Sequence, residues 1–365
     1  MRNSSMRNRF GTTAAIALMV SVGTVLLSAC GPENGDSAPT AAPTGSAAPA
    51  APAPTGSAPG AGAPGTAAPG APAPSGSAAP GGKEVNGTSA ANHLTISTGT
   101  RTVALNGTTV DFGTVVRDLA WSPDGRKAAF VNGDGDLVTA NPDGSGKVVL
   151  AKNPGGETWS HPTWRHATKD PIVTDTGDKA LERFAAIVFT SEKGGTLRLE
   201  KVATKSPGAT PEVLTPSSSE GGGDPIPQPP QTGNTWANAG GHRGEIVYAN
   251  TPANEVYLYD DYIRPSTREM GKGSQPALSP DGEHLVFVRS VNGHDHLFTR
   301  STQGDQKAEK DLTPSAATDY TQPAWSPDGR TIAVRTPDGI STLPADGSAA
   351  PTQVSTIKGL PSYRP

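Results

Sequence analysis

The tetrapeptide Ser-Pro-Asp-Gly occurs three times in this chain, at residues 122–125, 279–282 and 326–329. Each copy follows Trp or Leu and precedes a short apolar run. Proline sets φ for a tight turn, aspartate accepts nearby backbone N–H groups, and glycine supplies the positive φ that closes a hairpin. We therefore predict a repeated strand–turn–strand unit, and the residues that form its turns are Pro123, Asp124, Gly125, Pro280, Asp281, Gly282, Pro327, Asp328 and Gly329.

Further short β-prone runs follow each copy at similar spacing. After the first copy they lie at 127–131, 136–140 and 147–150, and after the last at 331–335, 340–343 and 351–357. The middle copy is followed by runs at 284–288 and 296–300, with a final strand near Leu312. Four short strands per unit, repeated every 40–50 residues or so, are typical of the blades of a β-propeller.

Two further units lack the tetrapeptide. Pro162-Thr163-Trp164 resembles the Pro-x-Trp that precedes the last copy, and Trp236 is interpreted as the anchor of the other degenerate unit. Four tryptophans, at 121, 164, 236 and 325, are then expected to pack between blades, which leaves Trp159 as the candidate for exposure. The Pro/Gly/Ser-rich stretch 206–235 is expected to loop out of the domain.

The two ends of the repeat region complement each other. Residues 93–112 contain three β-prone runs with turns at Gly99 and Asn106-Gly107, but no first strand. Residues 359–365 resemble a first strand with no blade after it. We therefore predict an all-β, six-bladed propeller closed by pairing of N- and C-terminal strands, with five blades as the alternative, because such pairing protects open sheet edges.

These residues resemble the TolB-type, WD40-like (PD40) β-propeller repeat: Pro-x-Trp-Ser-Pro-Asp-Gly, an apolar strand, and a later Asp-Gly-Ser turn, found here at 143–145 and 346–348. The resemblance spans about 113–365 and implies a TolB-like propeller domain over 83–365. It indicates a fold more than a function, because propellers carry many unrelated activities.

The first 29 residues read as an export signal: a basic start, an apolar run over 14–27, and small residues. Leu27-Ser28-Ala29-Cys30 matches the lipobox of bacterial lipoproteins, which implies lipid attachment at Cys30. The alternative is an ordinary signal peptide with a chance cysteine. Two acyl chains would anchor the chain stably to the cell membrane, on its extracytoplasmic side.

Residues 30–82 are predicted to be a disordered linker, since every residue from 37 to 82 is Ala, Pro, Gly, Ser or Thr. The formal net charge is −4, and removing a signal that carries three arginines lowers it to about −7. This charge argues against a nucleic-acid partner. We expect a monomer.

No convincing catalytic, cofactor or metal site is expected from the sequence. His294-Asp295-His296, with His284 nearby, could suggest a metal site, but the preceding Asn-Gly turn predicts solvent-exposed rim residues. The run 132–136 partly matches a calcium loop but has leucine at position 137, where glycine is required, so a polar hairpin is favoured. His161 and His166 flank Trp164 and are interpreted as structural or exposed. No Gly-x-Ser-x-Gly motif follows the repeats.

The leading hypothesis is that the propeller is not an enzyme but a scaffold that binds an envelope protein or peptide on one face or at its channel mouth. The alternatives are a propeller enzyme, such as a lyase or a glycan-processing protein, and a module that binds cell-wall carbohydrate. Clustered His, Asp, Glu and Arg around one cavity would favour the enzyme, and exposed aromatic residues on one face would favour carbohydrate.

Overall fold

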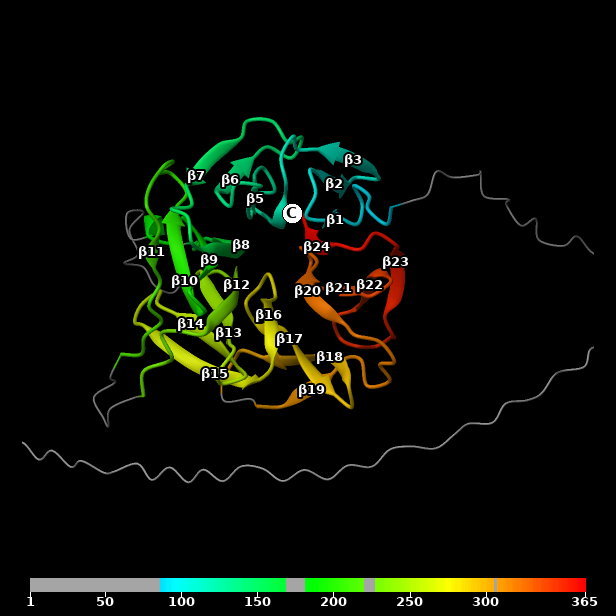
Figure 1. The fold of residues 1–365 in the computed structure, drawn as a ribbon. Coiled ribbons are helices and arrows are strands. Elements are labelled where there is room, and N and C mark those ends of the chain that lie inside the picture. The colour runs from blue at the N-terminus through cyan, green and yellow to red at the C-terminus, as the bar shows by residue number, and fades with distance from the viewer. Residues whose placement is uncertain (1–85, 169–180, 220–226, 305–306) are drawn as a thin grey trace, which may run out of the picture. The chain divides into compact units, whose positions relative to one another are not determined.

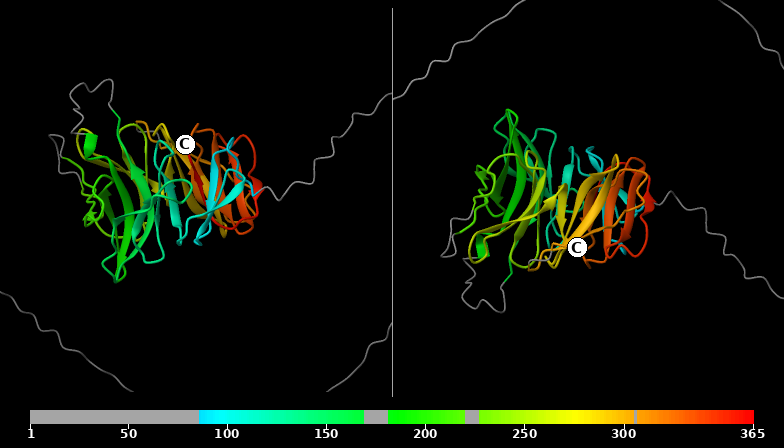
Figure 2. Two further views of the ribbon diagram at one scale, coloured as in Figure 1. Left: turned by 90° about the horizontal axis from the view of Figure 1, so that it is seen from above. Right: turned by 90° about the horizontal axis from the view of Figure 1, so that it is seen from below.

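A computed structural model describes residues 86–168, 181–219, 227–304 and 307–365. In these ranges, 24 strands form six four-stranded antiparallel sheets, which are arranged as a ring (Figure 1). Figure 2 shows the ring edge-on, with the strands crossing its thickness. The prediction of an all-β, six-bladed propeller is confirmed, and the five-bladed alternative is wrong. None of the helices in the described ranges is long and apolar enough to cross a membrane.

Each blade runs from an innermost strand at the channel to an outermost strand at the rim. Blades 1 and 2 consist of β4 (Arg117–Trp121), β5 (Ala128–Val131), β6 (Leu137–Ala140) and β7 (Val148–Ala151), and of β8 (Thr158–Arg165), β9 (Ala186–Lys193), β10 (Thr196–Ala203) and β11 (Glu212–Val213). Blades 3 and 4 consist of β12 (Asn234–Gly240), β13 (Glu245–Asn250), β14 (Glu255–Asp260) and β15 (Ser266–Lys272), and of β16 (Ser274–Leu278), β17 (His284–Val291), β18 (His294–Ser301) and β19 (Glu309–Asp311). Blades 5 and 6 consist of β20 (Thr321–Trp325), β21 (Thr331–Thr336), β22 (Gly339–Pro344) and β23 (Thr352–Ser355), and of β24 (Leu360–Tyr363), β1 (Leu94–Ser97), β2 (Thr102–Leu105) and β3 (Thr108–Asp111).

Blade 6 closes the ring, because it combines the two ends of the described chain. The C-terminal strand β24 pairs antiparallel with β1, in a register that places Leu94 opposite Tyr363 and Ser97 opposite Leu360. Beyond the strand, the backbone N–H of Arg364 donates to the carbonyl oxygen of His93 at 2.9 Å. The predicted pairing of residues 93–112 with the C-terminus is therefore confirmed.

A separate apolar cluster fills each interface between neighbouring blades. In β13, Ile246 and Tyr248 pack toward blade 2, whereas Val247, between them, packs toward blade 4. Side chains alternate between the two faces of a strand, so a strand buried on both faces is apolar at every position. This explains why the inner strands appear in the sequence as continuous apolar runs rather than as alternating patterns.

The insertion after blade 2 was expected to loop out of the domain, and for its described residues this is wrong. It supplies β11, and its next segment lies along β15 of blade 3: the N–H of Ser219 donates to the carbonyl oxygen of Pro265, and the N–H of Thr267 donates to the hydroxyl of Ser218. Its serine hydroxyls and carbonyls therefore cover part of an edge strand. The predicted signal segment 1–29, the linker 30–82 and Cys30 lie outside the described residues.

Candidate functional site

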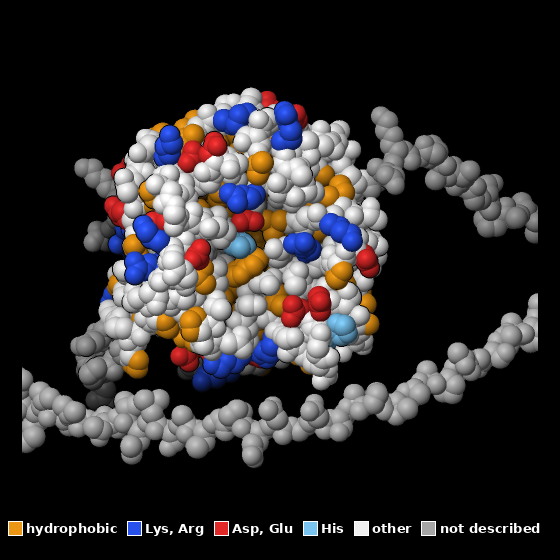
Figure 3. Space-filling model, viewed as in Figure 1, with side chains coloured by type: hydrophobic (Ala, Val, Ile, Leu, Met, Phe, Trp, Pro, Cys, Tyr) orange, Lys and Arg blue, Asp and Glu red, His pale blue; other side chains and the backbone are white. Residues whose placement is uncertain are grey.

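The innermost strands of the six blades line one central cavity of about 430 Å³. Each strand contributes the same segment, which ends at the anchor residue and in blades 1 to 5 begins at a β-bulge. In Figure 3 the centre of the ring is hollowed, and apolar side chains, a histidine and both signs of charge gather around it. This channel is lined by all six blades, and we treat it as the candidate binding site.

The side chain at the bulge end of the channel varies around the ring, and only blades 4 and 5 share a residue type. In blades 1 to 5 the bulge contains a non-glycine residue with φ between 49° and 55°, and these residues are Asp118, His161, Trp236, Gln275 and Gln322. Leu360 occupies the corresponding place in β24. A left-handed backbone costs an ordinary residue about 1 kcal/mol, and glycine avoids this cost. Five side chains are thus retained at positions where glycine would fit the backbone best.

Two of these side chains have a structural task. The carboxylate of Asp118 accepts the backbone N–H of His161 at 3.1 Å, and the amide oxygen of Gln275 accepts the backbone N–H of Gln322 at 2.7 Å. In both cases the polar group of one blade satisfies the bulge of the next blade. These bonds help to hold neighbouring bulges at a constant spacing around the channel.

His161 and Trp236 form an aromatic pair at the same level of the channel. Their ring centroids lie 3.6 Å apart with an interplanar angle of 38°. The Nδ1 atom of His161 is buried without a hydrogen-bond partner. Burial lowers the pKa of His161, against the opposing effect of the nearby Asp118 carboxylate, so the imidazole is neutral at pH 7.

The electrostatic character of the channel depends on one residue. Among the described lining residues, Asp118 has the only carboxylate side chain, and none is Lys or Arg. The rest of the lining is formed by proline, alanine, leucine, aromatic and amide side chains and a few glycines, hydroxyls and histidines. The site can therefore offer apolar contact, amide hydrogen bonds and one negative charge.

The other end of the channel is formed by the repeated turn, which has the same geometry in its three copies. In the first, the Ser122 hydroxyl donates to Asp124 at 2.6 Å and accepts the N–H of Lys127 at 2.9 Å, while Asp124 accepts the N–H of Arg126 at 3.1 Å. The copies beginning at Ser279 and Ser326 repeat these three bonds. The three prolines of the turns line the channel at this end.

These bonds favour the ionised form of each turn aspartate. The hydrogen bond from Ser122 lowers the pKa of Asp124, and that from Ser326 lowers the pKa of Asp328. Burial alone would raise the pKa of Asp281, but the bonds from Ser279 and the Glu283 amide outweigh it, so this pKa is lowered as well.

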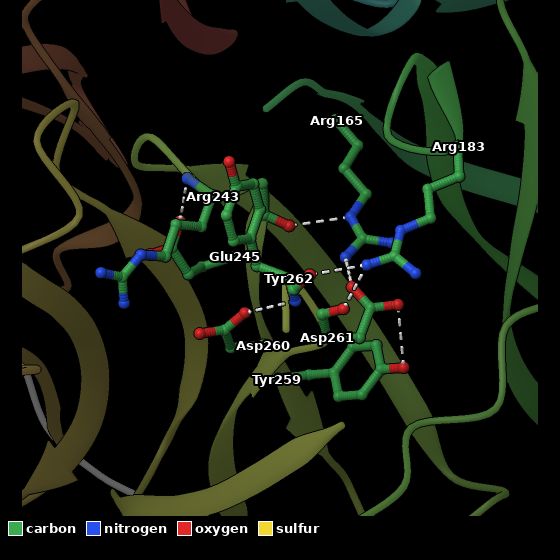
Figure 4. Close-up of polar contacts among 9 residues, drawn as sticks. Arg165, Arg183, Arg243, Glu245, Tyr259, Asp260, Asp261 and Tyr262 are labelled. Carbon is green, nitrogen blue, oxygen red and sulfur yellow. Dashed lines mark hydrogen bonds and ion pairs between the residues drawn. The ribbon is translucent and has the colours of Figure 1, made fainter. Parts of the chain in front are cut away.

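Blade 2 has no Ser-Pro-Asp-Gly turn, and Arg165 stands where the turn serine would be. Its side chain is 3% exposed, its Nε donates to the carbonyl oxygen of Gly244 in blade 3 at 2.8 Å, and its Nη2 forms an ion pair with Asp261 (Figure 4). Its guanidinium also lies over the ring of Phe184, 4.7 Å from the centroid. A buried, paired arginine thus joins blades 2 and 3 where the hairpin turn is missing.

A second arginine, Arg183, also bonds this Arg165–Asp261 cluster, which we call the clamp. Arg183 donates to the backbone carbonyls of Asp261 and Tyr262 at 2.7 and 2.8 Å, as Figure 4 shows. The hydroxyl of Tyr259 donates to the second carboxylate oxygen of Asp261 at 3.2 Å. Because Nε and Nη2 of Arg165 and both carboxylate oxygens of Asp261 have partners inside the protein, we interpret this cluster as structural.

In blade 6, too, an arginine after the anchor residue links the blade to the next one. Arg364 follows the anchor Tyr363, its Nε donates to the carbonyl oxygen of Gly125 in blade 1 at 2.7 Å, and its guanidinium lies 5.5 Å from the Trp121 ring centroid. Pro365 packs against the same turn, where a Cβ on Gly125 would come within 2.1 Å of its carbonyl oxygen. The closure therefore includes a contact that only glycine allows.

The tryptophans confirm three of the predicted anchors and correct two assignments. The indole N–H groups of Trp121, Trp164 and Trp325 each donate to the preceding blade. Trp236 is not an anchor: it lies in the bulge of β12, three residues before Ala239, which occupies the anchor place. Trp159 is not exposed either, since it is 2% exposed and packs on Phe189 with centroids 4.9 Å apart.

The histidines of blade 4 do not converge. His284 and His294 lie at opposite ends of the β17–β18 hairpin. Nδ1 of His294 lies 3.4 Å from Asp319, and Nδ1 of His296 lies 2.9 Å from Asp311. His296 is 5% exposed, so the expectation of a solvent-exposed rim residue is wrong for it, although His294 is partly exposed. Within the described ranges, no group of three His, Cys, Asp or Glu residues could hold a metal ion.

The run 132–136 forms a polar hairpin between β5 and β6, as favoured. The side-chain oxygen of Asn132 accepts the N–H groups of Asp134 and Asp136 at 3.0 and 2.8 Å. His166 is exposed and lines the turn end of the channel.

The bulge residues as a set were not predicted from the sequence. The signal that could have identified them is their fixed place, three residues before each anchor.

No protein-family model matches this chain. Among solved structures, the crystal structure of TolB from Acinetobacter baumannii matches 74% of this chain and 66% of its own length, with 15% identity and a TM-score of 0.50. A putative TolB from Agrobacterium tumefaciens matches with 16% identity over 73% of this chain and 89% of its own, at a TM-score of 0.49. At such identities the likeness concerns the fold alone: the described domain is a six-bladed β-propeller that is structurally similar to TolB.

Proposed function

We propose that this protein is a lipid-anchored, extracytoplasmic scaffold that binds a protein or peptide of the cell envelope at the bulge end of its channel. The observation that supports the proposal most strongly is the set of five strained, non-glycine bulge residues around a single cavity. Backbone strain of this kind is concentrated at functional sites. Four residue types occupy the five positions, as a surface that recognises one asymmetric ligand requires.

The chemistry of the lining favours binding over catalysis. Trp236 and Leu360 provide apolar contact, and Gln275, Gln322 and Asn238 provide amide groups. Burial of aromatic surface, with a few polar groups that fix orientation, is how peptide and protein partners are commonly held. A single carboxylate beside a neutral, buried imidazole lacks the paired titratable groups on which a lyase or hydrolase mechanism would depend.

Site-specific photo-crosslinking tests the binding site. A photoreactive amino acid replaces Gln322 in the full chain, and this variant is expressed in the native cell envelope. The control variant carries the same amino acid in place of Val149, which is 42% exposed on the outer strand of blade 1. A discrete adduct from position 322 that is missing from position 149 supports the proposal. Identical adducts from both positions, or none from position 322, would reject the channel mouth as the binding site.

The anchor is tested separately. Replacing Cys30 by serine removes the thiol that would carry the lipid, so the chain should move from the membrane to the soluble fraction and lose labelling by a fatty-acid probe. Membrane retention and labelling that persist in the serine variant would reject lipid attachment at Cys30.

A further inference from the structure

We infer that the channel mouth selects a peptide that places a basic group, either a Lys or Arg side chain or a free amino terminus, against the carboxylate of Asp118. This inference rests on the proposed function and specifies the chemistry of the partner. Its basis is charge complementarity: the described lining has one carboxylate side chain and no Lys or Arg side chain.

The carboxylate of Asp118 has capacity left for a ligand. It accepts one backbone N–H, at 3.1 Å from His161, whereas an ionised carboxylate can accept about four hydrogen bonds. No ion pair between described residues includes Asp118. The side chain is also partly exposed, so a basic group can reach it from the channel.

Neither Arg117 nor His161 forms an ion pair with Asp118 within the described ranges. Arg117 precedes it in the chain, but its Nη2 donates to the carbonyl oxygen of Asn132 at 3.1 Å, in the β5–β6 hairpin, and the residue is not part of the lining. His161 is neutral at pH 7, because burial lowers the pKa of its imidazole. A negative charge inside a cavity attracts a cation more strongly than a charge on an open surface would.

The aromatic pair beside Asp118 fits the same ligand. Trp236 stacks on His161, and the backbone N–H of His161 donates to Asp118. The bulge residues of blades 1, 2 and 3 are therefore neighbours at this end of the channel. Tryptophan is the side chain best suited to contact a cationic group through its ring face. Its apolar surface can also cover the aliphatic part of a lysine or arginine, which buries methylene groups while the charge stays paired.

A phage-displayed library of random peptides, panned against the full chain in detergent, tests the preference. We expect the enriched peptides to contain a common Lys or Arg and to lose binding in Trp236→Ala. One such peptide and its version with alanine at the basic position are then measured against wild type and Asp118→Asn. Asparagine keeps an oxygen that can accept the His161 N–H but removes the charge.

In wild type the basic peptide should bind about tenfold more tightly than its alanine version, and this ratio should approach one in Asp118→Asn. The control, Asp134→Asn, makes the same charge change at an exposed hairpin of blade 1 and should leave the ratio unchanged. Equal denaturation midpoints establish that the variants are folded.

Three results would overturn the inference in distinguishable ways. If peptides bind through Trp236 but show no basic preference, or if Asp118→Asn leaves the ratio intact, the inference fails while the proposed binding site stands. If no peptide depends on Trp236, the proposed site itself fails. If calcium ions bind at Asp118 more tightly than the basic peptide does and displace it, the carboxylate is a metal ligand, and the inference is overturned as well.

Discussion

The two ends of each innermost strand differ in how much they vary around the ring. At the turn end, three blades have the same tetrapeptide and the same three hydrogen bonds. At the bulge end, the same backbone conformation is occupied by Asp, His, Trp and two Gln residues, with leucine at the corresponding place in the sixth blade. The repeated end is built from interactions that any blade needs. The variable end holds strained side chains of four types, of which Asp118 and Gln275 also bond the next blade, and for this reason we place recognition there.

The largest expected effect concerns the end that closes the ring. Deleting residues 359–365 removes β24 with Tyr363 and Arg364 and opens the edge of β1, whose Leu94 and Ile96 are buried. We expect a loss of more than about 5 kcal/mol in unfolding free energy, or failure to fold, measured by urea denaturation. A chain in which the same residues are replaced by a Gly/Ser segment of equal length should fail equally. An unchanged midpoint would show that the ring does not depend on this strand.

The second effect concerns the blade that lacks the turn. Arg165→Ala leaves Asp261 without its buried partner and removes a link between blades 2 and 3. We expect a loss of about 3–5 kcal/mol, because an uncompensated charge is left in a poorly solvated place. Arg198→Ala, on an exposed position of β10, is the control and should cost less than about 0.5 kcal/mol. A similar cost for both would mean that the clamp does not replace the missing turn.

The third effect is a change in acid stability at the turn end. Since the folded-state pKa values of Asp124, Asp281 and Asp328 are lowered, their contribution is present above about pH 4 and is lost as the pH falls through those values. The triple variant in which all three are asparagine should be less stable than wild type at neutral pH, and its stability should fall less steeply below about pH 4. Melting temperatures measured across this range test the sign, and parallel curves would contradict it.

These comparisons also show what the sequence could and could not predict. The turns, the blade count and the closure were predictable, because proline, aspartate and glycine constrain φ locally and because Tyr363 lies at the repeat spacing. The strands β10 and β15 were missed, since polar and charged residues such as Lys201 and Glu269 alternate through outer strands that face solvent on one side. The bulges were missed because the residue types Asp, His and Gln do not by themselves specify a left-handed backbone.

Trp236 shows how a single-residue match misleads. A tryptophan at the expected spacing was interpreted as an anchor, whereas the register between β12 and β13 places it at the bulge. The misassigned residue is one that contacts the ligand in our proposal. Three positions before the anchor place, its ring lines the channel and stacks on His161 of blade 2.

The smallest expected effect concerns whether the bulge side chains at the variable end stabilise the fold or only strain its backbone. Gln322 has φ of 54°, and its side chain accepts one bond from the exposed Arg335 at 3.2 Å. Gln322→Gly should relieve the left-handed strain, and we expect unfolding free energy to stay within about 0.5 kcal/mol of wild type or to rise slightly. Gln275→Gly removes in addition the acceptor of the Gln322 N–H, and should be less stable than Gln322→Gly by about 1 kcal/mol. If Gln322→Gly were instead the more destabilised variant in urea denaturation, the side chain would be required by the fold, and the bulge end would resemble the turn end after all.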